Sequence, residues 1–280
     1  MPGGWQHVPP LRCLYLDLDG TLLGRGGSLF DGGDGGVTLL GARAVEACLR
    51  AGVELVPVSG RRGTNVREDA RLLGARSFVF EAGACVVLDG EEHWLTAPWL
   101  PRDEASIHEQ LAATGAPGLL LEAYAGRLEH HAPWHVDREV SHLFRGMVDP
   151  AEAEALLAAE GIEGLRLVDN GTIHHQATLP GIERPRAYHL VPAQASKARA
   201  VATHMRARGY AREEVIAAGD SREDMGAALA VGTFWLVRNA VERDPSLTED
   251  IARHDNVRVA EASHGAGVYE AVVTTLAERR

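Results

Sequence analysis

The sequence predicts an α/β protein in which a doubly wound parallel sheet is interrupted by an inserted α+β module. Short apolar runs alternate with helix patterns near both ends of the chain, and this alternation stops between residues 84 and 188. Strands that alternate with helices are typical of βαβ units. At roughly 150 residues per domain, the 280 residues would form about two domains.

The first α/β stretch begins with the apolar run LRCLYLDL at 11–18, which is typical of a strand covered on both faces. A helix is expected at 38–51, with Thr38 as N-cap candidate and Gly52 as its stop. A strand, a helix and a strand are then expected at 53–58, 63–73 and 77–80.

The middle of the chain has a different pattern. The run ACVVLDGEEHWLT indicates a hairpin, and helices and short strands are expected at 103–114, 149–160, 165–169 and 172–177. The alternation then resumes, with helices and strands expected at 196–208, 214–218, 221–230, 233–237 and 267–278. We therefore assign residues 1–83 and 189–280 to a core domain and residues 84–188 to an inserted α+β domain.

Composition argues against several classes of protein. Hydrophobic residues (45%) and charged residues (24%) match an ordinary globular protein. No run approaches the ~18 apolar residues of a membrane span, and the start lacks a signal pattern, so we expect a cytoplasmic protein without a membrane partner. The net charge of −11 argues against a nucleic-acid partner. Cys13, Cys48 and Cys85 are expected to be buried free thiols.

Two carboxylates end the first predicted strand. Asp17 and Asp19 lie two residues apart in LDLDGTLL, so alternation along the strand sends both side chains in the same direction. Crowded carboxylates repel each other and mark a cation site or a protonated group more often than a structural feature. The following Gly20 lets backbone amides approach an anion at the carboxyl edge of the sheet, where ligands bind. The alternative is an ordinary acidic turn.

Further polar groups follow other elements at the same predicted edge. Ser59 and Gly60 close the second strand, although Ser-Gly after a strand is often only a turn. Lys197 begins a helix, where its amine and the helix N-terminus favour an anion. It is the only lysine in a chain whose other basic side chains are all arginine, which suggests a position that resists arginine. Biased base composition is the alternative explanation.

A second acidic pair follows the strand VIAAG. Asp220 stands in Gly219-Asp220-Ser221, and Asp224 comes one helical turn later. Acidic residues at a helix start are also ordinary caps. The order Asp-x-Asp, Ser, Lys and Gly-Asp-Ser-x-x-Asp, with each group at a strand end or a helix start, resembles the four motifs of the haloacid dehalogenase-like hydrolase superfamily. The matching segments are DLDGT at 17–21, Ser59, Lys197 and GDSREDM at 219–225.

Spacing places the insertion after the second motif. Asp17 and Ser59 leave room between them for a loop and one helix only, whereas the long interval before Lys197 can hold a cap. This looks like the type II cap arrangement, and VSGR, FEAGACVV and HGAGVYEAV are similar to the branch with sugar-phosphate phosphatases. Two positions depart from that branch: Glu223 and Ala82 stand where it often has Asn. Both departures put the substrate, rather than the nucleophile, in doubt.

The resemblance implies a Rossmann-like core and a magnesium-dependent phosphatase that hydrolyses a small phosphate monoester, such as a sugar or polyol phosphate. It implies that Asp17 is the nucleophile and forms an aspartyl-phosphate, and that Asp19 is the general acid and base. It assigns Mg²⁺ to Asp17, the Asp19 backbone carbonyl, Asp220 and Asp224. It assigns phosphate binding to Gly20, Thr21, Ser59, Gly60 and Lys197.

The cap is expected to contact the rest of a small phosphorylated metabolite. Its candidate substrate contacts are His174, His175, Arg184 and Arg186. Two alternatives remain open. A phosphomutase on the same scaffold would keep every motif, and only its product would distinguish it. A phospho-ligand sensing or receiver-like protein also clusters aspartates, Ser or Thr and Lys, but it needs only one α/β domain.

Overall fold

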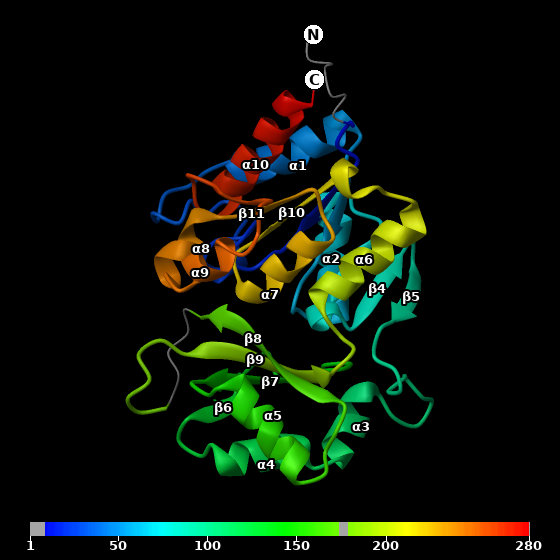
Figure 1. Cartoon of the computed structure of the whole chain (residues 1–280), viewed down its shortest axis with the longest axis vertical. Helices are drawn as coiled ribbons and strands as arrows, with labels where there is room; N and C mark the ends of the chain where they lie inside the picture. Colours follow the sequence, from blue (N-terminus) through cyan, green and yellow to red (C-terminus); the bar gives the residue numbers. More distant parts are fainter. Residues whose placement is uncertain (1–8, 174–178, 280) are drawn as a thin grey trace.

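A computed structural model describes residues 9–173 and 179–279 (Figure 1). Its central sheet has five parallel strands in the order β12-β11-β10-β1-β2. Their bounds are β1 Cys13–Leu16, β2 Glu54–Pro57, β10 Val215–Gly219, β11 Thr233–Leu236 and β12 Val257–Val259. The predicted α/β fold with a parallel core sheet is confirmed.

Helices cover both faces of this sheet, because alternate residues of its buried strands point to opposite sides. Leu14 and Leu16 of β1 pack with α1 (Leu40–Ala51) and α10 (His264–Glu278). Cys13 and Tyr15 instead face the layer that contains α6 (Lys197–Arg208) and α7 (Arg222–Met225). Asp17 follows with the same parity as Cys13 and Tyr15, so β1 directs it toward α6.

A three-stranded antiparallel sheet extends the core beyond β2. Its strands are β3 Phe78–Phe80, β4 Cys85–Leu88 and β5 Glu91–Trp94. The bridge between Val58 and Val79 joins β3 to the end of the second strand, and α2 (Gly63–Leu73) packs on β3 and β4. The predicted hairpin therefore pairs with a strand of the core.

The inserted module is a four-stranded antiparallel sheet in the order β6-β7-β9-β8 with helices on one side. Its strands are β6 Leu128–His130, β7 His142–Gly146, β8 Leu165–Thr172 and β9 Arg186–Pro192. The helices are α3 Ile107–Ala113, α4 Ala116–Ala123 and α5 Pro150–Ala159. In Figure 1 this cap lies below the core, with β8 next to α7.

The strands do not follow the predicted domain limits of 84 and 188 at either end. The β4–β5 hairpin, assigned to the cap from its sequence, pairs with β3, and β9 continues past residue 188 to Pro192. Local patterns cannot place such limits, because hydrogen bonding between strands far apart in sequence decides which sheet a strand joins. The domain limits therefore remain a prediction.

Short elements account for most differences from the predicted secondary structure. The helix expected at 221–230 is α7 followed by a 3₁₀ turn at Gly226–Leu229. The strand expected at 172–177 overlaps β8 only at Thr172, and residues 174–178 lie outside the described residues. Unpredicted elements include α4, β6, β7, β12 and the two helices α8 (Arg238–Arg243) and α9 (Leu247–Ile251). Most of these are too short to give a periodic pattern.

Two other expectations can be compared with the structure. The three cysteines are buried and free, as predicted. Within residues 9–173 and 179–279, no helix has the length and apolarity needed to cross a membrane.

Gly83 allows the turn after β3 to touch the beginning of α6. Its φ of +92° is in the left-handed region, and a Cβ at this position would overlap the backbone of Ser196 and Lys197. Glycine is required here for two reasons: it adopts the positive φ without strain, and its missing Cβ leaves room for the backbone of α6. This contact fixes the height of Lys197 relative to the sheet.

We expect Gly83→Ala to destabilise the fold by about 2–5 kcal/mol, the sum of left-handed strain and overpacking. Gly90→Ala is the matched control, because Gly90 also has a positive φ (+97°) but nothing lies near its Cβ position. The control should cost only about 1 kcal/mol. Urea unfolding of both variants measures the difference, and equal losses would contradict a backbone contact at Gly83.

Candidate active site

The carboxyl ends of β1 and β10 bring three carboxylates together. Asp17 follows β1 and donates its backbone N–H to the Ala218 carbonyl of β10 (3.0 Å). Asp220 follows β10, and Asp224 lies on α7 directly after it. One oxygen from each of these carboxylates lies within 4.8 Å of the others. The structure thus places Asp17, Asp220 and Asp224 in one cluster, as the sequence motifs imply.

Lys197 lies between two of these carboxylates. Its Nζ donates to Asp17 Oδ1 (2.8 Å) and Asp224 Oδ1 (2.6 Å), and only 2% of the residue is exposed. Although burial alone would lower the pKa of Lys197, Asp17 and Asp224 raise it above its ordinary value. The amine is therefore charged at every physiological pH. Ser196 caps α6 by accepting from the Arg199 backbone N–H, which fixes the first residue of the helix.

The negative charge of the cluster exceeds its positive charge. Burial, followed by the neighbouring Asp224 carboxylate, raises the pKa of Asp17. Thr21 Oγ1 donates to Asp17 Oδ2 (2.9 Å), and Arg243 forms an ion pair with Asp220. Burial raises the pKa of Asp220 even though Arg243 opposes the shift. Two buried carboxylates and the half-buried Asp220, which face two cations, are a donor set that suits a hard divalent ion, because such an ion prefers oxygen ligands.

Asp224 is held more firmly than the other two carboxylates. Its Oδ2 accepts from Ser221 Oγ (2.6 Å) and from the Ser221 backbone N–H (3.1 Å) in a capping box. A Cβ on Gly219 would overlap the side chain of Asp224. With Lys197 on the other oxygen, Asp224 has both oxygens occupied, which suits a support for a metal site better than a free ligand.

Asp19 lies apart from this cluster. Its side chain is 53% exposed and accepts two 2.6 Å hydrogen bonds from Arg61. Arg61 also donates to Asp69 Oδ2 (2.9 Å). The sequence pattern did not single out Arg61, although it lies in the VSGR segment that was compared with the superfamily. The two hydrogen bonds from the Arg61 guanidinium fix the orientation of the Asp19 carboxylate.

The second strand contributes Ser59 and Gly60 at the same edge. Ser59 is buried, and its Oγ accepts from the Arg61 backbone N–H (3.1 Å). A Cβ on Gly60 would lie 2.8 Å from His189 Nε2 in the cap, so glycine allows the cap to contact this loop closely.

At the first motif, Gly20 has a φ of +85°, and a Cβ there would overlap Asp220. Gly20 therefore permits the close approach of the two motif loops.

A buried polar network from the cap reaches the Ser59–Gly60 loop. Glu81 accepts from Ser141 Oγ (2.9 Å), and Ser141 Oγ contacts His189 Nδ1 (3.1 Å). Arg138 donates to Ser141 Oγ (2.8 Å) and to the Gly60 carbonyl (2.6 Å). Burial, followed by the charges of Arg138 and Lys197, lowers the pKa of His189, so its ring is neutral. No sequence motif connected these residues, which come from three distant segments.

Asn170 is a further cap residue at this interface. Its Nδ2 would lie 3.5 Å from a Cβ on Gly60. Its Oδ1 is buried, and within residues 9–173 and 179–279 it has no hydrogen-bond partner. A buried polar atom without a partner is costly, by about 1–3 kcal/mol. Asn170 is therefore a candidate substrate contact that none of the sequence motifs identifies.

The four cap residues that the sequence suggested as substrate contacts do not share one environment. Arg186 pairs with Asp169 (2.6 Å) and lies 3.5 Å from Asp244 of the core. Arg184 is exposed. His174 and His175 lie outside the described residues.

Glu223 has a specific partner in the cap. Its Oε2 accepts from Arg166 Nη2 of β8 (2.8 Å), which joins α7 to the cap across the interface. A carboxylate at this position would repel a phosphate if it were unpaired. Burial raises the pKa of Glu223, and the Arg166 charge opposes this shift. The pairing explains how the fold accommodates the departure from Asn.

The comparisons with known proteins agree with this geometry. Residues 175–274 match the family model of sucrose-6F-phosphate phosphohydrolase. A phosphoglycolate phosphatase of Methanoculleus marisnigri is 25% identical over 265 residues, which cover 94% of this chain and 95% of that protein.

Solved structures show the same fold along the whole chain. The sucrose-phosphatase of Synechocystis has a TM-score of 0.65 at 16% identity and covers 95% of this chain and 98% of its own. A haloacid dehalogenase-like hydrolase of Bacteroides thetaiotaomicron has a TM-score of 0.59 at 16% identity, covering 94% and 99%. The order of the motifs and the fold along the whole chain make this protein similar to phosphatases of the haloacid dehalogenase-like superfamily, and its residues 175–274 match the sucrose-phosphatase family.

Proposed function

We propose that this phosphatase uses Mg²⁺ and an aspartyl-phosphate on Asp17 to hydrolyse a sugar or polyol phosphate. The observation that supports this most is the position of Asp17. It is buried at the carboxyl edge of the sheet, it is oriented by Thr21 and Lys197, and it lies within 4.8 Å of two further carboxylates.

The chain's own residues supply a two-step reaction. An Asp17 oxygen attacks phosphorus, and the bond from phosphorus to the ester oxygen breaks while Asp19 donates a proton to that oxygen. Asp19 then takes a proton from water, which attacks the aspartyl-phosphate, releases phosphate and restores the Asp17 carboxylate. Because Arg61 holds Asp19 by two hydrogen bonds, Asp19 must exchange at least one of them for the substrate.

Asp17, the Asp19 backbone carbonyl and Asp220 would hold Mg²⁺, with Asp224 in support. The ion would offset the repulsion between the Asp17 carboxylate and the phosphate dianion. Arg243 now pairs with Asp220, so it would give up this contact to the ion. Ser59, the Gly60 amide, Gly20 and Thr21 would bind the phosphate oxygens, as the motif positions imply. Lys197 would orient Asp17 and add a positive charge beside the phosphate.

The cap favours a neutral, hydroxyl-rich leaving group. Asn170 and the neutral His189 face the Ser59–Gly60 loop and can exchange hydrogen bonds with hydroxyl groups. The cap cations Arg166 and Arg186 are already paired with Glu223 and Asp169. The related protein named a sucrose-phosphatase was solved with sucrose and phosphate. The relative named a phosphoglycolate phosphatase points to a smaller anionic substrate, which would need a free cation.

The chemistry is tested by phosphate release from p-nitrophenyl phosphate. We expect turnover with Mg²⁺, none in excess EDTA, and a loss of at least ~10³-fold in Asp17→Asn, because an amide cannot form the covalent intermediate. Asp103→Asn, on an exposed turn, is the matched control and should retain the parental rate. Undiminished rates in EDTA would contradict the metal, and activity of Asp17→Asn within tenfold of the parent would move the nucleophile elsewhere.

Lys197→Arg should also inactivate the enzyme. The guanidinium keeps the charge, but its width does not fit the buried gap between Asp17 and Asp224, and a displacement of ~1 Å can cost about 10²-fold in rate. Steady-state kcat is the measurement. Arg199→Lys, on the exposed side of the same helix, should leave kcat unchanged. Parental turnover in Lys197→Arg would show that the sole lysine is a compositional accident.

A substrate panel tests the specificity. We expect kcat/KM for sucrose 6-phosphate or glucose 6-phosphate to exceed that for 2-phosphoglycolate by at least about tenfold, the effect of one unpaired polar group. Asn170→Ala should lower kcat/KM for the preferred sugar phosphate while p-nitrophenyl phosphate turnover stays the same. A preference for 2-phosphoglycolate would contradict the proposed class, and an isomeric sugar phosphate in place of free phosphate would identify a mutase.

A further inference from the structure

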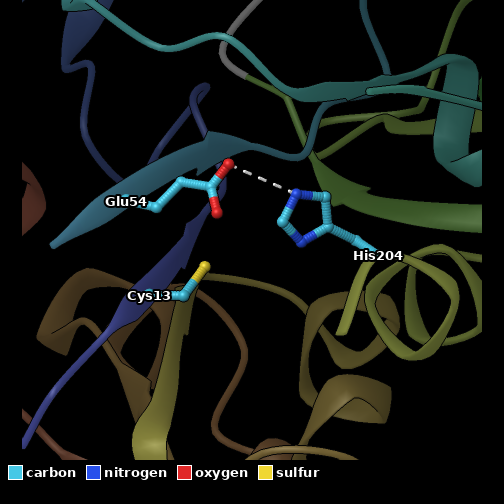
Figure 2. Close-up of side chains that lie close together, drawn as sticks. All are labelled: Cys13, Glu54 and His204. Carbon is cyan, nitrogen blue, oxygen red and sulfur yellow. Dashed lines mark ion pairs between the residues drawn. The ribbon is translucent and has the colours of Figure 1, made fainter. Parts of the chain in front are cut away.

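A second cluster of potential metal ligands lies away from the active site, at the opposite end of β1. Cys13 begins β1, Glu54 begins β2, and His204 lies on α6. One ligand atom from each of these residues lies within 4.8 Å of the others. Figure 2 shows the three side chains converging, with the imidazole facing the carboxylate and the thiol beside both. The phosphatase reaction uses none of them.

The two ring nitrogens of His204 have the environments that are usual for a metal-binding histidine. The residue is fully buried, and its Nδ1 lies 2.8 Å from the Tyr15 hydroxyl. Its Nε2 has no hydrogen-bond partner in the part of the chain that the structure describes. A histidine that binds metal usually donates its other ring N–H to a neighbouring acceptor, which fixes the ring. Tyr15 can provide that acceptor, and this tautomer leaves the lone pair of Nε2 directed at the cluster.

The distance between His204 and Glu54 suits two ligands of one ion better than a hydrogen bond. His204 Nε2 lies 3.5 Å from Glu54 Oε1 (Figure 2), whereas N–H···O bonds are about 2.7–3.2 Å long. In a tetrahedral zinc site with bonds of about 2.0–2.2 Å, nitrogen and oxygen ligands are about 3.4 Å apart. The third group, the Cys13 sulfur, is a ligand that favours zinc over magnesium.

The negative charges at the cluster can neutralise the two positive charges of a divalent ion. Arg208 is shared between Glu54 (3.2 Å) and Asp89 (2.7 Å), so Asp89 can balance Arg208 when Glu54 binds a cation. Although burial raises the pKa of Glu54, the hydrogen bond from Tyr210 and the charge of Arg208 help to lower that pKa below its ordinary value. The carboxylate is therefore ionised, and with a Cys13 thiolate it would neutralise the two positive charges.

The Cys13 thiol is protonated in the absence of an ion. Burial raises its pKa well above the ordinary value, and hydrogen bonding with Tyr15 opposes this shift. Binding would replace the thiol proton by the metal and release that proton to solvent. The Tyr15 hydroxyl could then donate to the thiolate while it accepts from His204 Nδ1, so every polar group of the cluster would have a partner. Glu54 is partly exposed and offers the route of entry.

We propose that Cys13, Glu54 and His204 form a binding site for one zinc-class divalent cation, with water as the fourth ligand. The ion would join β1, β2 and α6. These elements position Asp17 and Lys197 at the other end of the sheet, so the site would stabilise the fold without taking part in phosphate transfer.

Cobalt absorption tests this proposal on the full-length protein. The metal-free protein is titrated with Co²⁺ in excess Mg²⁺, which occupies the all-oxygen site at Asp17. We expect one equivalent of Co²⁺ to produce the near-ultraviolet band of a cobalt–thiolate bond, and Zn²⁺ to abolish that band. Zn²⁺ should also raise the midpoint of thermal unfolding. Absence of the band in the parent protein would overturn the proposal without affecting the proposed phosphatase function.

Two variants identify the ligand thiol. Cys13→Ser should lose the band, while Cys48→Ser should keep it, because Cys48 is another buried free cysteine that lies outside the cluster. A band that persists in Cys13→Ser would overturn the assignment of the ligand. If Cys13→Ser does not fold, His204→Gln provides the same comparison: a shifted or weakened cobalt spectrum supports the site, and an unchanged spectrum overturns it.

Discussion

The structure of the active site depends on one buried ammonium group. Lys197 Nζ is the hydrogen-bond donor shared by Asp17 and Asp224, and without it two buried carboxylates would face each other uncompensated. Breaking a buried ion pair is costly because it leaves an unpaired charge in a medium that solvates it poorly. The backbone contact at Gly83, the Ser196 cap and the packing of α6 on β1 all place this amine at the required depth.

Polar contacts join the cap to the core beside a small apolar contact. The hydrophobic cluster of the cap includes Ala84 and Trp94 from the core side. The polar contacts across the interface include Arg166 with Glu223 and Arg138 with the Gly60 carbonyl. Polar contacts of this kind can exchange partners with water, so they permit a cap to open and close over a substrate. The neutral His189 lies at this interface together with the Asn170 oxygen, which has no hydrogen-bond partner among the residues that the structure describes.

Much of the core could be predicted from the sequence. The run LRCLYLDL predicted a buried strand. The order of Asp17, Ser59, Lys197 and Asp220 predicted that these residues lie at the carboxyl edge of one sheet. Such inferences succeed because strand and helix periods are local properties and because parallel strands place their carboxyl ends together. The cap could be predicted only as a class, since its strands β6 and β7 are short and pair with β9, which is distant in the sequence.

The sequence by itself determined the fold class, and it predicted the superfamily and the residues of the phosphate site, because each of these inferences follows from local pattern and motif order. Only the tertiary structure decided which side chains touch. It placed Lys197 between two carboxylates, bound Asp19 to Arg61, paired Glu223 with Arg166 and brought Cys13 to Glu54 and His204. These partners are separated by tens of residues or more along the chain, and burial decides their charge states. Neither property is encoded in the spacing of residues along one segment.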